Sequence, residues 1–244
     1  MRGMKLRGKC LGVFIDQKNE RKRCVVKKTV KTILACLIVA CMCFLFVACE
    51  DDTTCDGDEM MAKKPVIYLY PEIDTVCSVK LTLDGELTCT YPEYGENGWE
   101  NFLAKPDGTL IFEDGRSYYC LYWEGISNMR SDFSKGFCVK GAESAAFLEK
   151  ALAEIGLNER EANEFIIYWL PILEENEYNV ISFQTENYDE SAKLEITPTP
   201  DSVLRVFMSF YESEGFVEIE PQSFDRFERN GFVVVEWGGG EVTK

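Results

Sequence analysis

Apolar and polar positions alternate along much of the chain after residue 64. Residues 65–70 are apolar on both faces, which predicts a strand buried on both sides. Residues 76–83 alternate strictly and end at Asp84-Gly85, so we expect a half-buried strand, a turn and a hairpin partner at 86–91. Further short strands are predicted at 109–112, 118–123 and 136–140. The first half of this region is therefore expected to be a series of short antiparallel strands.

The apolar period lengthens in the middle of the chain, where it fits a helix. A run of apolar residues on one helical face ends at Gly156, a residue that readily takes the left-handed position after a helix. Asn158 and Glu161 have the spacing of a capping box, which opens a second amphipathic helix. Pro171 is expected to end or bend this helix. The pattern predicts a helical hairpin at about residues 143–171.

Strand patterns return in the last third of the chain. The candidate segments are 179–185, 193–197, 203–211, 216–219 and 232–237. The order of strands, two helices and further strands predicts an α+β fold, mainly antiparallel. We expect strands within 65–140, the two helices within 141–175, and strands again within 178–240.

A sixteen-residue apolar run, 33–48, separates a basic leader from an acidic remainder. Residues 1–32 carry eleven Lys and Arg against two Asp and Glu, whereas residues 33–244 carry fifteen against forty. Positive charge before an apolar segment keeps that flank in the cytoplasm, so the acidic part is expected to be exported. The run fits a signal-peptide core and is slightly short for a membrane-spanning helix. We interpret residues 1–48 as a basic leader plus a signal or anchor segment, and a later start at Met4 stays open.

The end of the apolar run resembles a bacterial lipobox. Small Ala48 would permit cleavage, and the thiol of Cys49 would carry the lipid, although Phe46 stands where Leu is usual. A second match ends at Cys41, but cleavage there would leave an apolar segment exposed. An uncleaved single-pass anchor and ordinary cleaved secretion are the alternatives. Each places the protein outside the cytoplasm, and we expect the extracytoplasmic face of the cell membrane.

The segment after the apolar run is polar. Residues 49–64 are acidic and lack apolar periodicity, which predicts a flexible tether. Residues 65–244 are then expected to form a single α+β extracytoplasmic domain, a length that suffices for one core or for two small packed subdomains.

Composition excludes several classes of function. The net charge of −16 argues against nucleic-acid binding, which needs Lys and Arg to neutralise phosphates. The chain has no histidine, which removes Ser-His-Asp and Cys-His catalysis and histidine-ligated metals. Neither a phosphate-binding glycine loop nor a Ser-x-x-Lys dyad occurs. We therefore predict no nucleotide, cofactor or metal site.

Four cysteines fall in the predicted domain. They are Cys77, Cys89, Cys120 and Cys138. Export permits disulfides, and four cysteines allow three pairings. Each lies in a strand-like apolar context, so free buried thiols are an equal alternative.

Three carboxylates lie beside tryptophans, either along the chain or one helical turn away. They are Glu124, Glu164 and Glu236. A glycoside hydrolase needs two carboxylates that flank a sugar ring, together with aromatic platforms. Surface or structural carboxylates give the same pattern in a chain with forty-two Asp and Glu.

Aromatic residues are dense between residues 68 and 123 and are candidates for a binding face. We single out Trp99, Tyr122 and Trp123, because half-exposed rings on a sheet can bind a glycan or a peptide. The alternative is that these rings pack the core, since aromatic residues favour strands anyway.

Several short segments resemble a group of uncharacterised bacterial exported and envelope proteins. They are Lys-Pro-Val-Ile-Tyr-Leu-Tyr-Pro at 64–71, Thr-Cys-Thr-Tyr-Pro at 88–92, Trp-Glu-Gly at 123–125, Tyr-Trp-Leu-Pro at 168–171 and Val-Glu-Trp-Gly-Gly at 235–239. The resemblance implies one intact domain behind an export signal. It brings no activity and no functional residues.

Taken together, the sequence predicts a membrane-anchored lipoprotein of the cell envelope that acts as a binding or envelope-associated module. Its expected partners are the membrane and a glycan or protein ligand. One alternative is an exported hydrolase with paired carboxylates, acting on glycans. The other is an accessory subunit that docks a partner protein.

Overall fold

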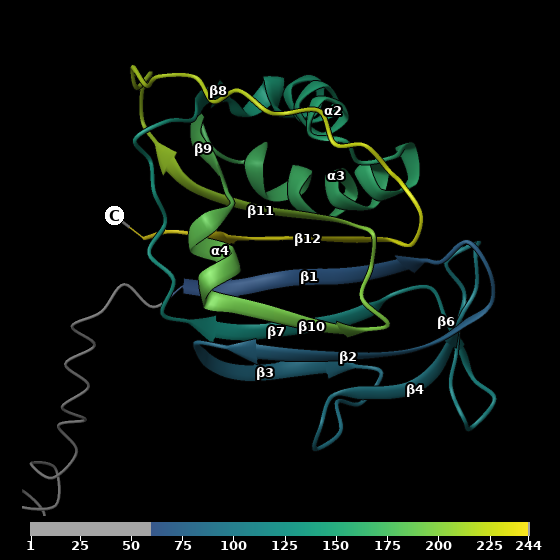
Figure 1. The fold of residues 1–244 in the computed structure, drawn as a ribbon. Helices are drawn as coiled ribbons and strands as arrows, with labels where there is room; N and C mark the ends of the chain where they lie inside the picture. Colours follow the sequence, from purple (N-terminus) through teal and green to yellow (C-terminus); the bar gives the residue numbers. More distant parts are fainter. Residues whose placement is uncertain (1–59, 244) are drawn as a thin grey trace, which may run out of the picture. The chain divides into compact units, whose positions relative to one another are not determined.

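The computed structural model describes residues 60–243. The predicted lipid-attachment residue Cys49, the leader and apolar segment at 1–48, and residues 49–59 of the predicted tether lie outside this range. The described part contains both sheets and helices, with strands in the majority, which is a mixed α+β fold (Figure 1). Within it, none of the helices combines the length and the apolar character needed to cross a membrane.

The first strand begins earlier than the sequence pattern predicts. Strand β1 is Met60–Tyr70, so the last five residues of the predicted tether belong to a sheet. Met60 and Ala62 are buried, but the register shifts between Lys63 and Val66. This bulge breaks the alternation and hides the beginning of the strand from a periodicity argument.

A seven-stranded sheet has the order β3-β7-β1-β12-β11-β9-β8. Its strands besides β1 are β3 (Gly85–Tyr91), β7 (Leu121–Ser127), β8 (Phe137–Lys140), β9 (Tyr178–Gln184), β11 (Ser202–Ser213) and β12 (Val233–Glu241). Strand β12 lies between β1 and β11, pairing antiparallel with β1 and parallel with β11. Every other pair in this sheet is antiparallel.

A second sheet has five strands in the order β10-β2-β4-β5-β6. They are β2 (Thr75–Leu83), β4 (Trp99–Ala104), β5 (Leu110–Ile111), β6 (Ser117–Tyr118) and β10 (Ala192–Thr197). All of its pairs are antiparallel. Strand β10 forms one edge of this sheet.

The central strands of the seven-stranded sheet are buried on both faces. In β1, Ile67 and Leu69 pack in a core shared with the second sheet, whereas Val66 and Tyr68 pack in a core shared with the helices. Neighbouring residues of a strand point to opposite faces, so one strand contributes to both cores. Burial on both faces is what the unbroken apolar run at 65–70 predicts, and each such side chain contributes about 1.5–3 kcal/mol.

Two helices pack on the outer face of the seven-stranded sheet (Figure 1). Helix α2 is Ser144–Ile155, preceded by the 3-10 turn η1 (Gly141–Glu143), and helix α3 is Glu159–Leu173. The predicted capping box is confirmed: Glu161 N donates to Asn158 Oδ1, and Asn158 N donates to the Glu161 carboxylate. Pro171 does not end α3, which continues to Leu173, because a proline in the last turn removes only one helical hydrogen bond.

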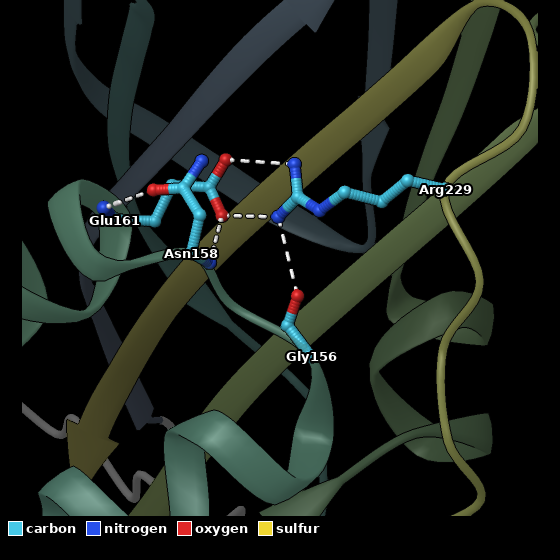
Figure 2. A network of polar contacts seen from close by, with 4 residues as sticks. All are labelled: Gly156, Asn158, Glu161 and Arg229. Carbon is cyan, nitrogen blue, oxygen red and sulfur yellow. Dashed lines mark hydrogen bonds and ion pairs between the residues drawn. The ribbon is translucent and has the colours of Figure 1, made fainter.

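The buried carboxylate of Glu161 also ties the helices to the chain just before β12 (Figure 2). Both guanidinium Nη atoms of Arg229 donate to it, and Arg229 Nη2 also donates to Gly156 O at 3.2 Å. Gly156 has a φ of 115°, and an added Cβ there would lie 2.8 Å from Phe227 Cβ. The link between α2 and α3 is therefore fixed by a cap, an ion pair and the close contact of Gly156 with the Phe227 side chain.

Several local predictions differ from the structure. Residues 76–83 and 86–91 do not form the predicted hairpin, because β2 pairs with β4 and β10 whereas β3 pairs with β7 in the other sheet. Residues 216–219 form no strand, and Phe216 is 69% exposed; only an isolated bridge at Glu220 pairs there. Strand β4 and the short helix α4 (Glu186–Ser191) were not predicted. Asn101, with a φ of 56°, interrupts the alternation of β4, and α4 is too short and polar to show a helical period.

Candidate functional site

Five tyrosines gather on the helix side of the seven-stranded sheet. We call them the tyrosine cluster: Tyr68, Tyr70, Tyr119, Tyr122 and Tyr168. They come from β1, from the start of β7 and the residues before it, and from α3. The Tyr68 ring lies 6.3 Å from that of Tyr70, nearly parallel to it, and 6.5 Å from that of Tyr119. The cluster therefore joins three segments that lie far apart in the sequence.

Lys64 links the two remaining tyrosines. Its Nζ lies 5.5 Å from the ring centroid of Tyr122 and 5.8 Å from that of Tyr168, within the range of cation–π attraction. Lys64 has a φ of 62° at the bulge of β1, and its backbone N–H donates to Glu124 Oε1 at 3.2 Å. The irregularity of β1 thus directs a main-chain donor toward this carboxylate.

A hydrogen bond between β1 and α3 fixes the centre of the cluster. Tyr68 OH donates to Glu164 Oε2 at 2.7 Å, and Arg160 Nε donates to the other oxygen at 3.3 Å. Burial raises the pKa of the Tyr68 phenol far above its usual range, and the bond to Glu164 raises it further. Tyr68 is therefore a permanent hydrogen-bond donor.

The thiol in this region is poorly suited to be a nucleophile. Burial, followed by the charge of Glu164, raises the pKa of Cys120 to about 12, from an ordinary value of 9.0. The thiolate is the reactive form, so the neutral thiol is inert near neutral pH. Cys77, Cys89, Cys120 and Cys138 are all free, but only Cys77 is fully buried and Cys89 is exposed, so the alternative of free buried thiols holds in full for Cys77 alone.

One side of the cluster borders exposed sheet. Tyr119 is 48% exposed, and Tyr91, on the same face of the sheet as Tyr122, is 59% exposed. In Figure 1 both helices lie toward the β8 end of the sheet, while β7 and the edge strand β3 lie at the other end. Two exposed tyrosine rings thus lie at this margin of the cluster.

The structure separates the three predicted carboxylates. Glu124 and Glu164 both lie at the tyrosine cluster, on the helix side of the sheet. Glu236 lies on the opposite face, fully buried, where it accepts from Trp123 Nε1 at 3.0 Å and from Arg205 Nε at 2.7 Å. Two of the three are therefore brought together, and the third is part of the core.

Two of the three predicted binding aromatics are buried. Trp99 is 1% exposed and donates its Nε1 proton to Pro92 O, and Trp123 is 0% exposed. Both pack between the two sheets, so the prediction that they form an exposed platform is wrong. Tyr122 is half-buried within the cluster; burial raises its pKa, and its hydrogen bond to Glu124 raises it further.

Sequence reasoning did not single out Lys64, Tyr68, Tyr119 and Tyr168 as site residues. The family resemblance could have pointed to them. Of these four residues, Lys64 and Tyr68 lie in the segment 64–71 and Tyr168 lies in the segment 168–171, and both segments carry the resemblance. Within residues 60–243, no three potential Cys, Asp or Glu ligands group closely enough to hold a metal ion.

Comparison with known proteins identifies a relative of unknown activity. Over 70 residues the chain is 44% identical to an uncharacterized protein in the bglA 3′ region of Butyrivibrio fibrisolvens, covering 28% of this chain and 69% of that protein. The chain belongs to the same family as this protein. No family model matches the chain, and no solved structure matches it. Membership of this family assigns no activity.

Proposed function

We propose that the chain is a membrane-anchored, extracytoplasmic module that binds a neutral glycan at the tyrosine cluster. The observation that carries the proposal is the meeting of tyrosine rings with two carboxylates, Glu124 and Glu164, beside an exposed part of the sheet. Sugar rings stack on aromatic faces, and their hydroxyls bind carboxylates and phenols. The acidic charge of the chain favours a neutral ligand over an anionic one.

The anchoring part of the proposal rests on the sequence. Lipidation at Cys49 would hold the protein at the outer face of the cell membrane, and residues after it would extend toward the envelope. An uncleaved anchor helix at 33–48 would place the domain on the same side of the membrane. Mass spectrometry of the protein from membranes decides between them, because only the lipoprotein begins at a lipid-modified Cys49.

We also propose that α2 and α3 act as a helical hairpin that supports the cluster. Only residues 156–158 separate the two helices, and both contribute to the core on the helix side of the sheet. Helix α3 supplies Glu164 and Tyr168 to the site. This arrangement would transmit any movement of the hairpin directly to the ligand face.

A second candidate function is a glycoside hydrolase, favoured by the shared location of Glu124 and Glu164. Each carboxylate already accepts hydrogen bonds from protein donors, Glu124 from Lys64 N and Glu164 from Tyr68 OH. Such donors fit anchoring groups better than a free acid and base. We therefore rank binding first.

Isothermal titration with neutral cello-, xylo- and manno-oligosaccharides tests the proposal on the full-length chain in detergent. We expect binding that weakens by about tenfold in Tyr119→Ala, since loss of one stacked ring costs on the order of 1 kcal/mol or more. Phe216→Ala removes an exposed aromatic ring outside the cluster and should bind normally.

The outcomes separate the candidates. Cleavage of a bound oligosaccharide that is lost in both Glu124→Gln and Glu164→Gln would favour the hydrolase. Binding that is equally weak in the Tyr119 and Phe216 variants would show that the cluster is not the site. Absence of binding to every sugar in the panel would count against a neutral glycan as the ligand.

A further inference from the structure

Strand β10 is an edge strand with a hollow beside it. Within residues 60–243 it pairs only with β2, at the margin of the five-stranded sheet. A hollow of about 640 Å³ is lined by all five residues from Lys193 to Thr197. Successive residues of a strand point to opposite faces, so a hollow that contacts five in a row follows the edge of the strand.

The open edge of β10 presents unused main-chain hydrogen-bonding groups. Leu194 lies opposite Leu81 of β2, and both main-chain groups of Leu81 bond to Tyr94 OH, with N···O and O···O distances of 2.8 and 2.9 Å. Leu81 therefore points its groups away from β10, which makes this a non-hydrogen-bonded pair of the antiparallel ladder. The N–H and C=O of Leu194 consequently point toward the hollow, and Ile196, two residues further, repeats the arrangement.

The opposite wall of the hollow belongs to β11 of the other sheet. It contains Val203, which is 44% exposed, and Arg205. The guanidinium of Arg205 holds Glu236 through Nε and Asp189 through Nη1, while its buried Nη2 has no hydrogen-bond partner within the described residues. The hollow is thus bordered by the exposed Val203 side chain, by the open edge of β10 and by Arg205 Nη2, a donor that lacks an acceptor within the described residues.

We propose that β10 binds an extended peptide as an added strand, one in which apolar residues alternate with basic residues. The side chains of Leu194 and Ile196 point inward, toward the core between the sheets. Residues of the added strand that pair with them point to the same side and therefore face the apolar wall at Val203. Lys193 and Glu195 point outward, and the carboxylate of Glu195 favours a basic residue opposite it on that face. A main-chain carbonyl of the peptide provides an acceptor for Arg205 Nη2. This site is separate from the tyrosine cluster and does not depend on it.

A second copy of the chain does not fit the same edge. If the β10 strands of two copies paired antiparallel, their five-stranded sheets would join edge to edge. The face of each that is covered by its own seven-stranded sheet would then lie on the same side of the joined sheet. Each seven-stranded sheet would then occupy the side where β11 of the other copy already forms the wall of the hollow. A single extended segment avoids this conflict, because it brings no second sheet with it.

The test uses a six-residue peptide, the length of β10, made of alternating Val and Lys and labelled with a dye. Fluorescence anisotropy measures its binding to the full-length chain in detergent. A peptide of the same sequence with alternate backbone amides methylated keeps charge and apolar surface but cannot pair with a strand. We expect it to bind at least about tenfold more weakly, because several main-chain hydrogen bonds are lost.

Two variants at one position isolate the edge. Leu194→Ala and Leu194→Pro both lose the leucine side chain, but only the proline variant loses the outward N–H. Because this N–H makes no bond to β2, an edge proline is tolerated there. We expect Leu194→Ala to keep most of the binding and Leu194→Pro to lose about tenfold more.

Hydrogen exchange provides a readout that does not depend on either variant. The amides of Leu194 and Ile196 should exchange rapidly in the free chain and become protected when the Val-Lys peptide is added. The proposal is overturned if the peptide fails to bind at about 1 mM, if the methylated peptide binds equally well, or if these two amides gain no protection.

Discussion

Arg205 and Glu236 face each other directly across the parallel pair β11–β12, with Arg205 Nε 2.7 Å from Glu236 Oε2. Glu236 is fully buried; burial lowers the pKa of Arg205, but Glu236, Tyr188 and Asp189 together raise it above its ordinary value. The Trp123 indole and Asp189 complete the network from the core to the surface. A carboxylate that the sequence offers as a catalytic candidate is therefore a partner in a buried ion pair.

Removal of one member of this pair should be costly. Arg205→Met leaves the buried Glu236 without its counter-charge, and we expect the free energy of unfolding to fall by about 3–5 kcal/mol. Adding Glu236→Gln should recover about 1–3 kcal/mol relative to the sum of the single changes. Urea denaturation of the three variants measures this coupling. Strictly additive losses would mean that the two side chains do not act as a pair.

The same logic applies to Arg229 and the buried Glu161 of Figure 2. Arg229→Ala should lower the free energy of unfolding by about 3 kcal/mol, because the carboxylate stays buried with only its backbone donor. Arg226 is exposed and lies three residues earlier in the same segment, so Arg226→Ala is a matched control. Equal losses in the two variants, measured by urea denaturation, would refute the role given to Arg229.

Because several tyrosines are buried, we expect the free energy of unfolding to fall at alkaline pH. Burial raises the pKa of Tyr68, Tyr70, Tyr122 and Tyr188 above the ordinary value of 10.0. In the unfolded chain these phenols ionise near pH 10, so their contribution is fully present below that pH and declines as the pH rises further. We expect urea midpoints to fall above about pH 10, and less steeply in Tyr68→Phe than in a control change at the exposed Tyr91. Identical slopes for both variants would contradict this account.

Cysteine labelling tests whether Cys77, between the two sheets, and Cys120, on the helix side of the seven-stranded sheet, are buried. Burial raises the pKa of Cys77 to about 11, and the pKa of Cys120 is about 12, whereas Cys89 is exposed on the edge strand β3. Brief treatment with iodoacetamide at neutral pH should therefore modify Cys89 first, and Cys77 and Cys120 only after unfolding. Peptide mass mapping reads each site separately. Cys89→Ser confirms the assignment, and labelling of Cys120 in the folded chain as fast as Cys89 would argue against the fold around it.

The periodicity of apolar residues predicts an element well when no bulge or distant pairing partner disturbs that periodicity. The capping box at Asn158 and Glu161 is a local interaction, so four residues suffice to predict it. The strand at Met60 is hidden because a bulge at Lys63 shifts the register, and this shift depends on pairing with distant strands. Residues 216–219 show the reverse, since a favourable strand pattern found no neighbour to pair with.

The site was only partly predictable for a related reason. Glu124 and Glu164 were chosen for their tryptophan neighbours, yet Lys64 binds the first and Tyr68 the second, and no spacing rule connects either pair. Trp99 and Trp123 carry the same β propensity as surface aromatics, and only the packing of the second sheet decides that they are buried. Which face of a strand is covered is a property of the whole topology.

The central place of β12 has a consequence for the order of synthesis. This strand is the last of the described strands to leave the ribosome, yet it lies between β1, the first, and β11 (Figure 1). Until it emerges, β1 can pair only with β7, and the three strands β3, β7 and β1 stay separate from the three strands β11, β9 and β8. The nascent chain therefore cannot complete this sheet until β12 has left the ribosome, so the two groups of strands must wait for it before they can join.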